Sequence, residues 1–340
     1  MNKNKKILVT GAAGFIGWHI SIQLLKNGFG VVGIDNLNDY YDVSLKADRL
    51  RELRKFKSFI FHKIDIKEKE LTDNIFETYR PEYVVHLAAQ AGVRHSIDNP
   101  YKYLDSNLIG FMNVLEACRN YPVKQLIYAS SSSVYGGNTI TPFSTSHKAD
   151  HPVSLYAATK KTNELLAHTY SHLYGIPTTG LRFFTVYGPW GRPDMAYFKF
   201  TKYIYEGRSI DIYNHGEMER DFTYIDDVTE GIYGLIEKPP VPDAAWDESN
   251  DNGGSFAPYK VYNIGKGNPE KLERFISLLE EKIGKKAKRN YMAMQPGDVL
   301  KTYADISGLE SDIGFKPKTS LEEGLEKFVD WYRKYYKTVS

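Results

Sequence analysis

In the first half of the chain, short apolar runs alternate with longer amphipathic stretches. The apolar, β-branched runs predict strands at residues 6–10, 30–35, 58–62, 83–87, 125–130 and 178–184. The helical spacing of apolar positions predicts helices at residues 18–27, 67–79, 101–119 and 156–174. Regular alternation of strands and helices is typical of a doubly wound parallel sheet. The pattern therefore predicts an α/β fold whose ligands bind beyond the carboxyl ends of the strands.

The last third has the same kinds of element in a less regular order. It predicts strands at 209–213 and 261–264, and helices at 197–206, 225–237, 269–283 and 321–336. Residues 238–258 are rich in Pro, Asp, Asn and Gly, which predicts a mobile surface insertion without chemistry. We expect residues 1–186 to form the doubly wound domain, with 222–265 packing back onto it. Residues 187–340 would mainly form a smaller C-terminal α/β domain.

A glycine-rich turn lies between the first predicted strand and the first predicted helix. Gly11 permits a tight turn, Gly14 lets a pyrophosphate approach the main chain, and Gly17 lets the helix pack close to the strand. The helix N-terminus would hold the phosphates. Asp35 ends the second strand, where an acid binds ribose hydroxyls and repels a 2′-phosphate, so NAD is favoured over NADP. The alternative is an ordinary turn; the context favours a Rossmann-type NAD site.

Tyr156 and Lys160 are four residues apart and share one face of a predicted helix. An ammonium beside a phenol lowers the pKa of the phenol from its usual value of about 10, which makes it usable for proton transfer. The alternative is a solvated helix face. Ser130 to Ser133 follow the fifth strand, and one of these hydroxyls would bind the reacting oxygen beside Tyr156. The alternative for the serines is a plain polar turn.

Composition narrows the possible partners and compartment. The 340 residues are 42% hydrophobic, enough for a large core, and the net charge of +2 gives no reason to expect a nucleic acid or an anionic membrane as partner. The single cysteine, Cys118, excludes an internal disulfide and fits a reducing compartment. We find no signal peptide, no apolar run near the ~18 residues of a membrane span, and no metal-ligand spacing. The sequence predicts a soluble, cytoplasmic protein without a metal.

Several motifs together resemble one known family. KILVTGAAGFIG, the acid at Asp35, HLAAQAGVR, SSSSVYG, YAATK and RFFTVYGPWGRPDMA are similar to motifs of the extended short-chain dehydrogenase/reductases that act on nucleotide sugars, the NAD-dependent epimerase/dehydratase family. The resemblance covers nearly the whole chain. It implies that Ser131 is the catalytic hydroxyl, that Tyr156 is the acid/base, and that Lys160 lowers the pKa of Tyr156 and contacts the nicotinamide ribose. The residues implied to bind NAD are Gly11, Gly14, Phe15, Ile16, Gly17, Asp35, Asn36, Asn38, Asp65, Ile66, Leu87, Gln90, Asn107, Tyr156 and Lys160.

The resemblance also bears on the sugar. Sugar 4,6-dehydratases of the family carry Asp-Glu where this chain has Ser132 and Ser133, and UDP-glucuronate decarboxylases usually carry Glu at the second position. Serines cannot do that acid–base work, but they donate hydrogen bonds to a carboxylate. With Thr185, they are implied to hold the C6 carboxylate of UDP-glucuronate while its C4 is epimerised. Further residues are implied for the UDP-sugar. Arg94 would add positive charge to the C6 pocket, the alternative being a structural ion pair. Arg192 would contact the nucleotide, Arg220 the diphosphate, and Asp298, in the Gln295–Asp298 motif, the ribose of UDP.

Alternative functions remain open from the sequence. A UDP-glucose/UDP-galactose 4-epimerase would differ only in the C6 pocket. A UDP-glucuronate decarboxylase agrees less well with the two serines, and a non-catalytic NAD-binding regulator of the same fold often lacks the Tyr/Lys pair. By analogy with the family, the helices at 101–119 and 156–174 would pair across a homodimer.

Overall fold

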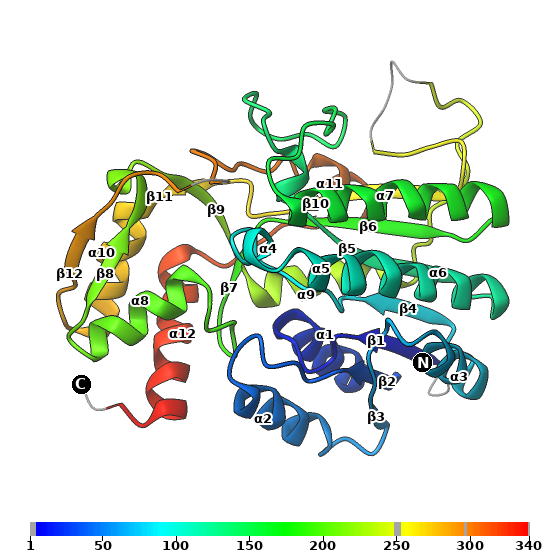
Figure 1. Cartoon of the computed structure of the whole chain (residues 1–340), viewed down its shortest axis with the longest axis horizontal. Coiled ribbons are helices and arrows are strands. Elements are labelled where there is room, and N and C mark those ends of the chain that lie inside the picture. Colours follow the sequence, from blue (N-terminus) through cyan, green and yellow to red (C-terminus); the bar gives the residue numbers. More distant parts are fainter. Residues whose placement is uncertain (1–4, 248–252, 296–297, 339–340) are drawn as a thin grey trace.

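A seven-stranded sheet covered by helices forms the larger part of the molecule, and a smaller lobe lies beside it (Figure 1). The computed structural model describes residues 5–247, 253–295 and 298–338. Every neighbouring pair of strands in the large sheet is parallel. The predicted α/β fold with a Rossmann-type, doubly wound parallel sheet is therefore confirmed.

The large sheet has the strand order β10-β6-β5-β4-β1-β2-β3. Its strands are β1 (Lys6–Thr10), β2 (Gly30–Asp35), β3 (Phe59–Lys63), β4 (Tyr83–His86), β5 (Gln125–Ser131), β6 (Thr178–Phe183) and β10 (Tyr259–Ile264). The central strands are almost entirely buried, as expected for a parallel sheet with helices on both faces. The order reverses at β1 and β4, so the cavity expected at the strand ends opens between them.

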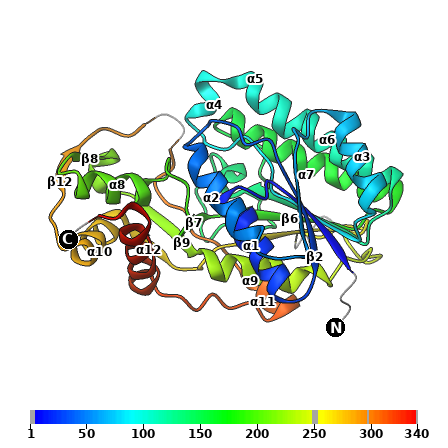
Figure 2. The same cartoon turned by 90° about the horizontal axis from the view of Figure 1, so that it is seen from below.

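Two helical layers cover this sheet (Figure 2). One face carries α1 (Phe15–Lys26) packed against α9 (Ile225–Ile236), with α2 (Val43–Leu53) beside α1. The other face carries α3 (Lys69–Tyr79), α6 (Gly110–Asn120) and α7 (Leu155–Tyr174). Short helices α4 (His95–Asp98) and α5 (Pro100–Tyr103) lead into a π-helical turn, Leu104–Ile109, that continues into α6.

The smaller lobe contains two small sheets. The first has the order β11-β9-β7, from β7 (Thr185–Tyr187), β9 (Glu219–Tyr224) and β11 (Pro269–Lys271), and the second pairs β8 (Ser209–Ile212) with β12 (Lys288–Tyr291). Its helices are α8 (Ala196–Tyr205), α10 (Leu272–Ile283) and α12 (Leu321–Tyr336), and α11 (Ser307–Ile313) packs near α9 and β10. Between β9 and β11 the chain returns to the large sheet as α9 and β10. The division at residue 186 stays a prediction.

The structure contains elements that the apolar pattern missed. Helix α2 was not predicted, because its buried side chains include Lys46 and Arg49 and its apolar stripe is incomplete. The predicted helix at 101–119 is divided among α5, the π-helical turn and α6. Within the predicted insertion, residues 248–252 lie outside the described residues. The described part is attached to the body, since Val261 donates its backbone N–H to the Gly253 carbonyl.

Candidate active site

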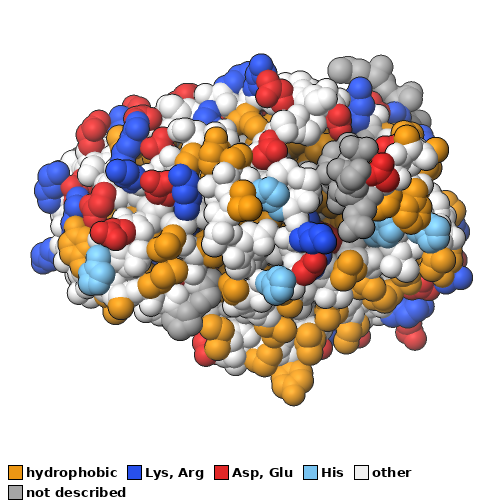
Figure 3. Space-filling view, turned by 90° about the horizontal axis from the view of Figure 1, so that it is seen from above, with side chains coloured by type: hydrophobic (Ala, Val, Ile, Leu, Met, Phe, Trp, Pro, Cys, Tyr) orange, Lys and Arg blue, Asp and Glu red, His pale blue; other side chains and the backbone are white. Residues whose placement is uncertain are grey.

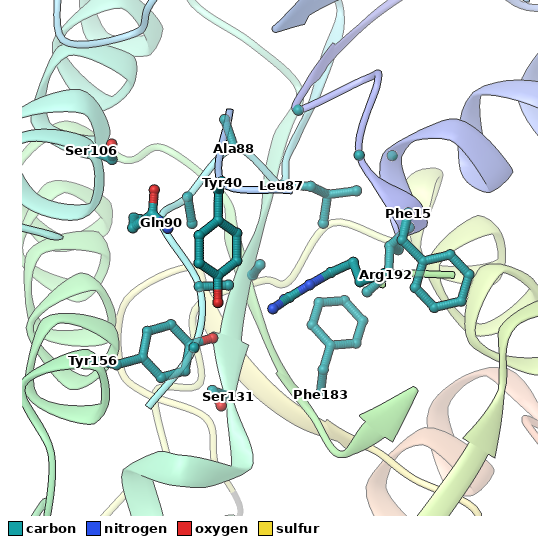
Figure 4. Close-up of a pocket in the computed structure, with 18 of the residues that line it drawn as sticks. Phe15, Tyr40, Leu87, Ala88, Gln90, Ser106, Ser131, Tyr156, Phe183 and Arg192 are labelled. Atoms are coloured by element: carbon teal, nitrogen blue, oxygen red, sulfur yellow. The ribbon is translucent and has the colours of Figure 1, made fainter. Parts of the chain in front are cut away.

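A cavity of about 500 Å³ runs along the carboxyl ends of the strands (Figure 4). It reaches from the glycine turn after β1 to the loops of the smaller lobe. The following predicted site residues line it: Gly11, Gly14, Phe15, Ile16, Gly17, Asp35, Asn36, Asn38, Asp65, Ile66, Leu87, Gln90, Ser131, Ser132, Ser133, Tyr156, Lys160, Thr185, Arg192 and Asp298. Asn107, Arg94 and Arg220 are not among its lining residues.

The glycine turn brings the start of α1 against the end of β1. Gly11 has a φ of +70°, a backbone conformation that favours glycine. A Cβ at Gly17 would lie 2.1 Å from the Gly11 carbonyl oxygen, so no side chain fits there. Helix α1 has no side-chain cap and no acid in its first turn. Its free N–H groups and positive dipole end therefore face the cavity, as a diphosphate requires.

Polar side chains from β2 and β3 surround the next part of the cavity. The Asp35 carboxylate accepts hydrogen bonds from the Ala13 and Leu37 backbone N–H groups, at 3.1 and 2.8 Å. The Asn36 amide donates to Asp65 at 3.0 Å. Asp35 is therefore fixed beside the glycine turn, where a ribose diol attached to that diphosphate would lie.

Ser131, Tyr156 and Lys160 meet at the other end of the cavity. Ser131 ends β5, and Tyr156 and Lys160 lie on the first two turns of α7. The Ser154 hydroxyl caps this helix by accepting from the Ala157 N–H at 3.1 Å. The Lys160 ammonium is buried and donates to the Ala129 carbonyl at 2.9 Å. Figure 4 shows the Tyr156 and Ser131 hydroxyls facing the same space.

The expected electrostatic effect of Lys160 on Tyr156 is not found in this structure. Burial raises the pKa of Tyr156, while a side-chain hydrogen bond with Ser131 and the charge of Arg192 lower it. Burial outweighs the other two effects, so the pKa of Tyr156 lies above its usual value. The Lys160 ammonium is directed to the Ala129 carbonyl. Burial lowers the pKa of Lys160 to about 8. The charge that lowers the pKa of Tyr156 is that of Arg192.

A buried ion pair fixes α7 to the sheet beneath these groups. Arg182 on β6 donates through Nε and Nη2 to the two carboxylate oxygens of Glu164, both at 2.8 Å, and the Ser130 hydroxyl donates to the same carboxylate at 2.7 Å. Both charged side chains are nearly inaccessible to solvent, at 4% and 2%. Glu164 lies one turn after Lys160, so this pair sets the position of α7 relative to Ser131.

Neutral hydroxyls line the wall beside Ser131. Ser132 and Ser133 form a 3₁₀ turn in which the Ser133 N–H donates to the Ser131 hydroxyl at 3.2 Å. Thr185 starts β7 on the neighbouring side of the cavity. No carboxylate occupies these three positions, so this wall offers hydrogen-bond donors to an anionic group and no general acid or base.

The three predicted site residues that do not line the cavity have other contacts. Asn107 accepts from the Gln90 N–H at 2.8 Å and donates to the Gln90 carbonyl at 3.0 Å, so it supports a cavity residue from behind. Arg94 pairs with Asp298 at 2.7 Å instead of extending into the C6 pocket. Arg220 donates to the Glu219 and Leu300 carbonyls at 2.9 and 3.1 Å. Of the predicted Gln295–Asp298 motif, residues 296 and 297 lie outside the described residues.

Several polar residues around the cavity were not predicted from the sequence. Lys46 donates to both oxygens of Asn38 at 2.9 Å. Arg49 is fully buried and donates to the carbonyls of Ala13 at 2.8 Å and Gly191 at 3.1 Å, so it joins the glycine turn to the loop after β7. The Tyr40 hydroxyl donates to the Asp194 carboxylate at 3.2 Å, and this contact joins the loop after β2 to the loop after β7. Lys46 and Arg49 are four and seven residues after Asp42, the N-cap of α2. A capping residue followed by positions at helical spacing was the only local sign that these two side chains share one face of a helix.

The profile of the NAD dependent epimerase/dehydratase family matches residues 7–265, most of the chain. The chain belongs to this epimerase/dehydratase family. Its relatives include Protein CapI of Staphylococcus aureus, 59% identical over 98% of this chain and 99% of the relative. A probable UDP-glucuronate 4-epimerase of Rhizobium meliloti is 47% identical over 98% of both chains. The UDP-glucuronic acid 4-epimerase of Bacillus cereus, crystallised with UDP-glucuronic acid and NAD, is 35% identical with a TM-score of 0.85, covering 97% of this chain and 100% of that one.

The residues of this family member fit its NAD cofactor. The glycine turn leaves no room for side chains at the diphosphate position, and the Asp35 carboxylate lies beside it. Among the described residues, no group of three or more His, Cys, Asp or Glu side chains has the geometry of a metal site. Across the same residues, no helix is both long and apolar enough to cross a bilayer.

Proposed function

We propose that this protein is an NAD-dependent UDP-glucuronate 4-epimerase, which converts UDP-glucuronate to UDP-galacturonate through a 4-keto intermediate. The observation that carries the proposal is the wall of neutral hydroxyls, Ser132, Ser133 and Thr185, next to Ser131 and Tyr156 in one cavity. The relatives from R. meliloti and B. cereus support the same substrate.

Tyr156 acts as the acid and base of this reaction. Its phenolate removes the proton of the 4-hydroxyl as C4 is oxidised, and its phenol returns the proton when C4 is reduced from the opposite face. When bound, NAD would supply the acceptor and then the donor of the C4 hydride, and it would be regenerated in each cycle. Ser131 donates a hydrogen bond to the sugar oxygen. Lys160, which is held at the Ala129 carbonyl, orients the nicotinamide ribose and adds positive charge.

The hydroxyl wall also has to prevent decarboxylation. The 4-keto sugar is a β-keto acid, which loses CO2 when its carboxylate is oriented for C–C cleavage. Ser132, Ser133 and Thr185 would hold the carboxylate by neutral hydrogen bonds in another orientation, without an acid or base to assist. The predicted contacts to the nucleotide are Arg192, Arg220 for the diphosphate and Asp298 for the ribose of UDP. Arg220 lies beside the ion pair that Arg94 forms with Asp298.

Purified protein incubated with UDP-glucuronate is expected to yield UDP-galacturonate, with no CO2 released. The two sugars separate by anion-exchange chromatography, and labelled carbon at C6 reports any CO2. Release of CO2 with a UDP-pentose would overturn the role given to the two serines. UDP-glucose is the matched control substrate, because it differs only at C6; an equal or higher rate on it would favour the neutral-sugar epimerase.

A homodimer is the assembly that we propose. Apolar side chains gather on the side of the molecule where α6 and α7 lie (Figure 3). The exposed ones on α4, the segment 100–109 and α7 are Ile97, Tyr101, Ile109, Leu165, Leu173 and Tyr174. Tyr101 is 77% exposed and Leu165 58% exposed. Monomeric proteins rarely leave so many large apolar groups uncovered on one face.

Light scattering at micromolar concentration is expected to give twice the 38.9 kDa mass of one chain. Leu165→Glu should produce a monomer by placing a charge in this face. Ile140→Glu is the matched control, since Ile140 is 71% exposed outside the face and its replacement should leave the dimer intact. A monomeric wild type would overturn the proposal.

We place the protein in the cytoplasm. The single cysteine, Cys118, is buried and unpaired, as suits a reducing compartment. Fractionation of the source cells should recover the protein with cytoplasmic markers, and its recovery in an external fraction would contradict this.

A further inference from the structure

Tyr40 links the cofactor side of the cavity to the loop that carries Arg192. It follows β2 by a few residues, next to Asn36 and Asn38. Its hydroxyl donates to the Asp194 carboxylate at 3.2 Å, across 154 positions of sequence. Its ring packs edge-on against His95, with 4.8 Å between the ring centroids. The Tyr40 side chain therefore spans three loops that extend from the ends of different strands.

The Tyr40 hydroxyl has a closely fitted position. Gly92, in the loop after β4, has a φ of +109°, and a Cβ built on it would lie 2.6 Å from the Tyr40 hydroxyl. The hydroxyl is thus held between the backbone of Gly92 and the carboxylate of Asp194. The centroid of the Tyr40 ring lies 5.8 Å from the guanidinium carbon of Arg192.

Asp194 in turn holds Arg192. The Arg192 guanidinium donates to Asp194 through Nε at 3.0 Å and also through Nη2. Burial alone would lower the pKa of Arg192, but the charge and hydrogen bonds of Asp194 raise it above its usual value, so Arg192 stays charged. Figure 4 shows Arg192 reaching into the cavity, with its guanidinium near the Tyr40 hydroxyl and facing Tyr156.

We propose that Tyr40 is a positioning residue that acts through Asp194 to hold the Arg192 guanidinium facing Tyr156. The other cations that line the cavity are directed elsewhere, since Lys46 donates to Asn38 and Lys160 donates to the Ala129 carbonyl. Arg192 is thus the cation that favours the phenolate in this structure. Tyr40 controls whether that charge stays in place. This inference rests on the proposed acid–base role of Tyr156.

Several groups surround the Tyr156 phenol, and they set what a pH profile reports. They are Lys160 on α7 itself, Ser131 on β5, Tyr103 on α5, and Arg192 on the loop after β7. A second layer contacts these groups: His95 lies against Tyr103, and Tyr40 and Asp194 lie against Arg192. Removing the Tyr40 hydroxyl changes none of these charges directly. We therefore expect its effect on the phenol to pass through the position of Arg192.

The test measures kcat for UDP-glucuronate on the NAD-containing enzyme as a function of pH. Tyr40→Phe keeps the ring and removes one hydrogen bond to a charged group, so kcat should fall about tenfold. The acidic limb of the profile should move to higher pH, because a displaced cation no longer favours the phenolate. In an Asp194→Ala background, which removes the acceptor of the Tyr40 hydroxyl, the same change should cost less than about twofold, since the two residues act as one unit.

Tyr291→Phe is the matched control. The Tyr291 hydroxyl donates to the Glu273 carboxylate at 3.1 Å, and it lies outside the cavity, so kcat and the pH profile should stay as in the wild type. Equal losses for Tyr40→Phe in both backgrounds, or an unshifted pH profile, would overturn the inference. An inactive wild type would instead overturn the proposed function.

Discussion

Tyr156→Phe should lower turnover of UDP-glucuronate by about a thousandfold, within the range that general acid–base catalysis contributes. Phenylalanine keeps the ring on α7 and removes only the hydroxyl that would carry the proton. NAD should remain bound in the purified variant, because the glycine turn and Asp35 are unchanged. Steady-state kinetics and the absorbance of released cofactor measure the two quantities.

The matched control for this prediction is again Tyr291→Phe, which removes a phenolic hydroxyl outside the cavity. A Tyr156→Phe enzyme that retained more than about a tenth of the wild-type rate would show that another group carries the proton. Loss of NAD together with activity would show that the hydroxyl serves binding instead of chemistry. A wild type that binds NAD but turns over no sugar nucleotide would favour the non-catalytic regulator.

Glu164→Gln should destabilise the protein by about 3–5 kcal/mol, because it leaves the buried Arg182 charge without its partner. We expect the midpoint of thermal unfolding to fall by roughly 5–10 °C. Both side chains are almost inaccessible, so solvent cannot compensate. Differential scanning calorimetry measures the shift. Glu310→Gln is the control: it breaks a pair with Lys316 at 2.8 Å, and both side chains are exposed, so the midpoint should barely change.

The Glu164 pair also gives an expected pH dependence. Burial acts to raise the pKa of Glu164, but the charge and hydrogen bonds of Arg182 outweigh it, so the folded-state pKa lies below the usual value. The stabilisation is therefore complete above the usual glutamate pKa of about 4.3, and it is lost as the pH falls through the lower folded-state value. The difference in unfolding free energy between wild type and Glu164→Gln should shrink in acid. A difference that grew on acidification would contradict this assignment.

The sequence alone was enough to predict those cavity residues that are placed by a single strand, turn or helix. The glycine turn and Asp35 lie at the ends of adjacent strands, and apolar runs locate those ends. Tyr156 and Lys160 lie together because one helix carries both. The parallel sheet then brings Ser131 to the same edge, because all strand ends of one direction meet there. These steps need only periodicity and the topology of an α/β fold.

Contacts between distant loops left no such pattern. Tyr40 and Asp194 are 154 positions apart, and Arg49 and Gly191 are 142 apart, so nothing near either residue indicates its partner. The direction of Lys160 was also beyond sequence reasoning. Helical spacing places its Cα beside Tyr156, but the rotamer sends its ammonium to the Ala129 carbonyl. Burial, which raises the pKa of Tyr156, depends on tertiary packing and not on the YAATK motif.

After β9 the chain returns to the large sheet, and this affects how segments can be exchanged between homologous enzymes. β10 pairs with β6 along its full length, and α9 packs on α1, although both follow the first segments of the smaller lobe. A fragment ending at residue 186 would lack the strand that covers β6 and the helix that covers α1. Exchanging the smaller lobe between homologues therefore requires two separate grafts, at residues 184–224 and 265–340, with the intervening framework retained. Ser132 and Ser133 would stay with the large sheet, so only the Thr185 part of the hydroxyl wall would be exchanged.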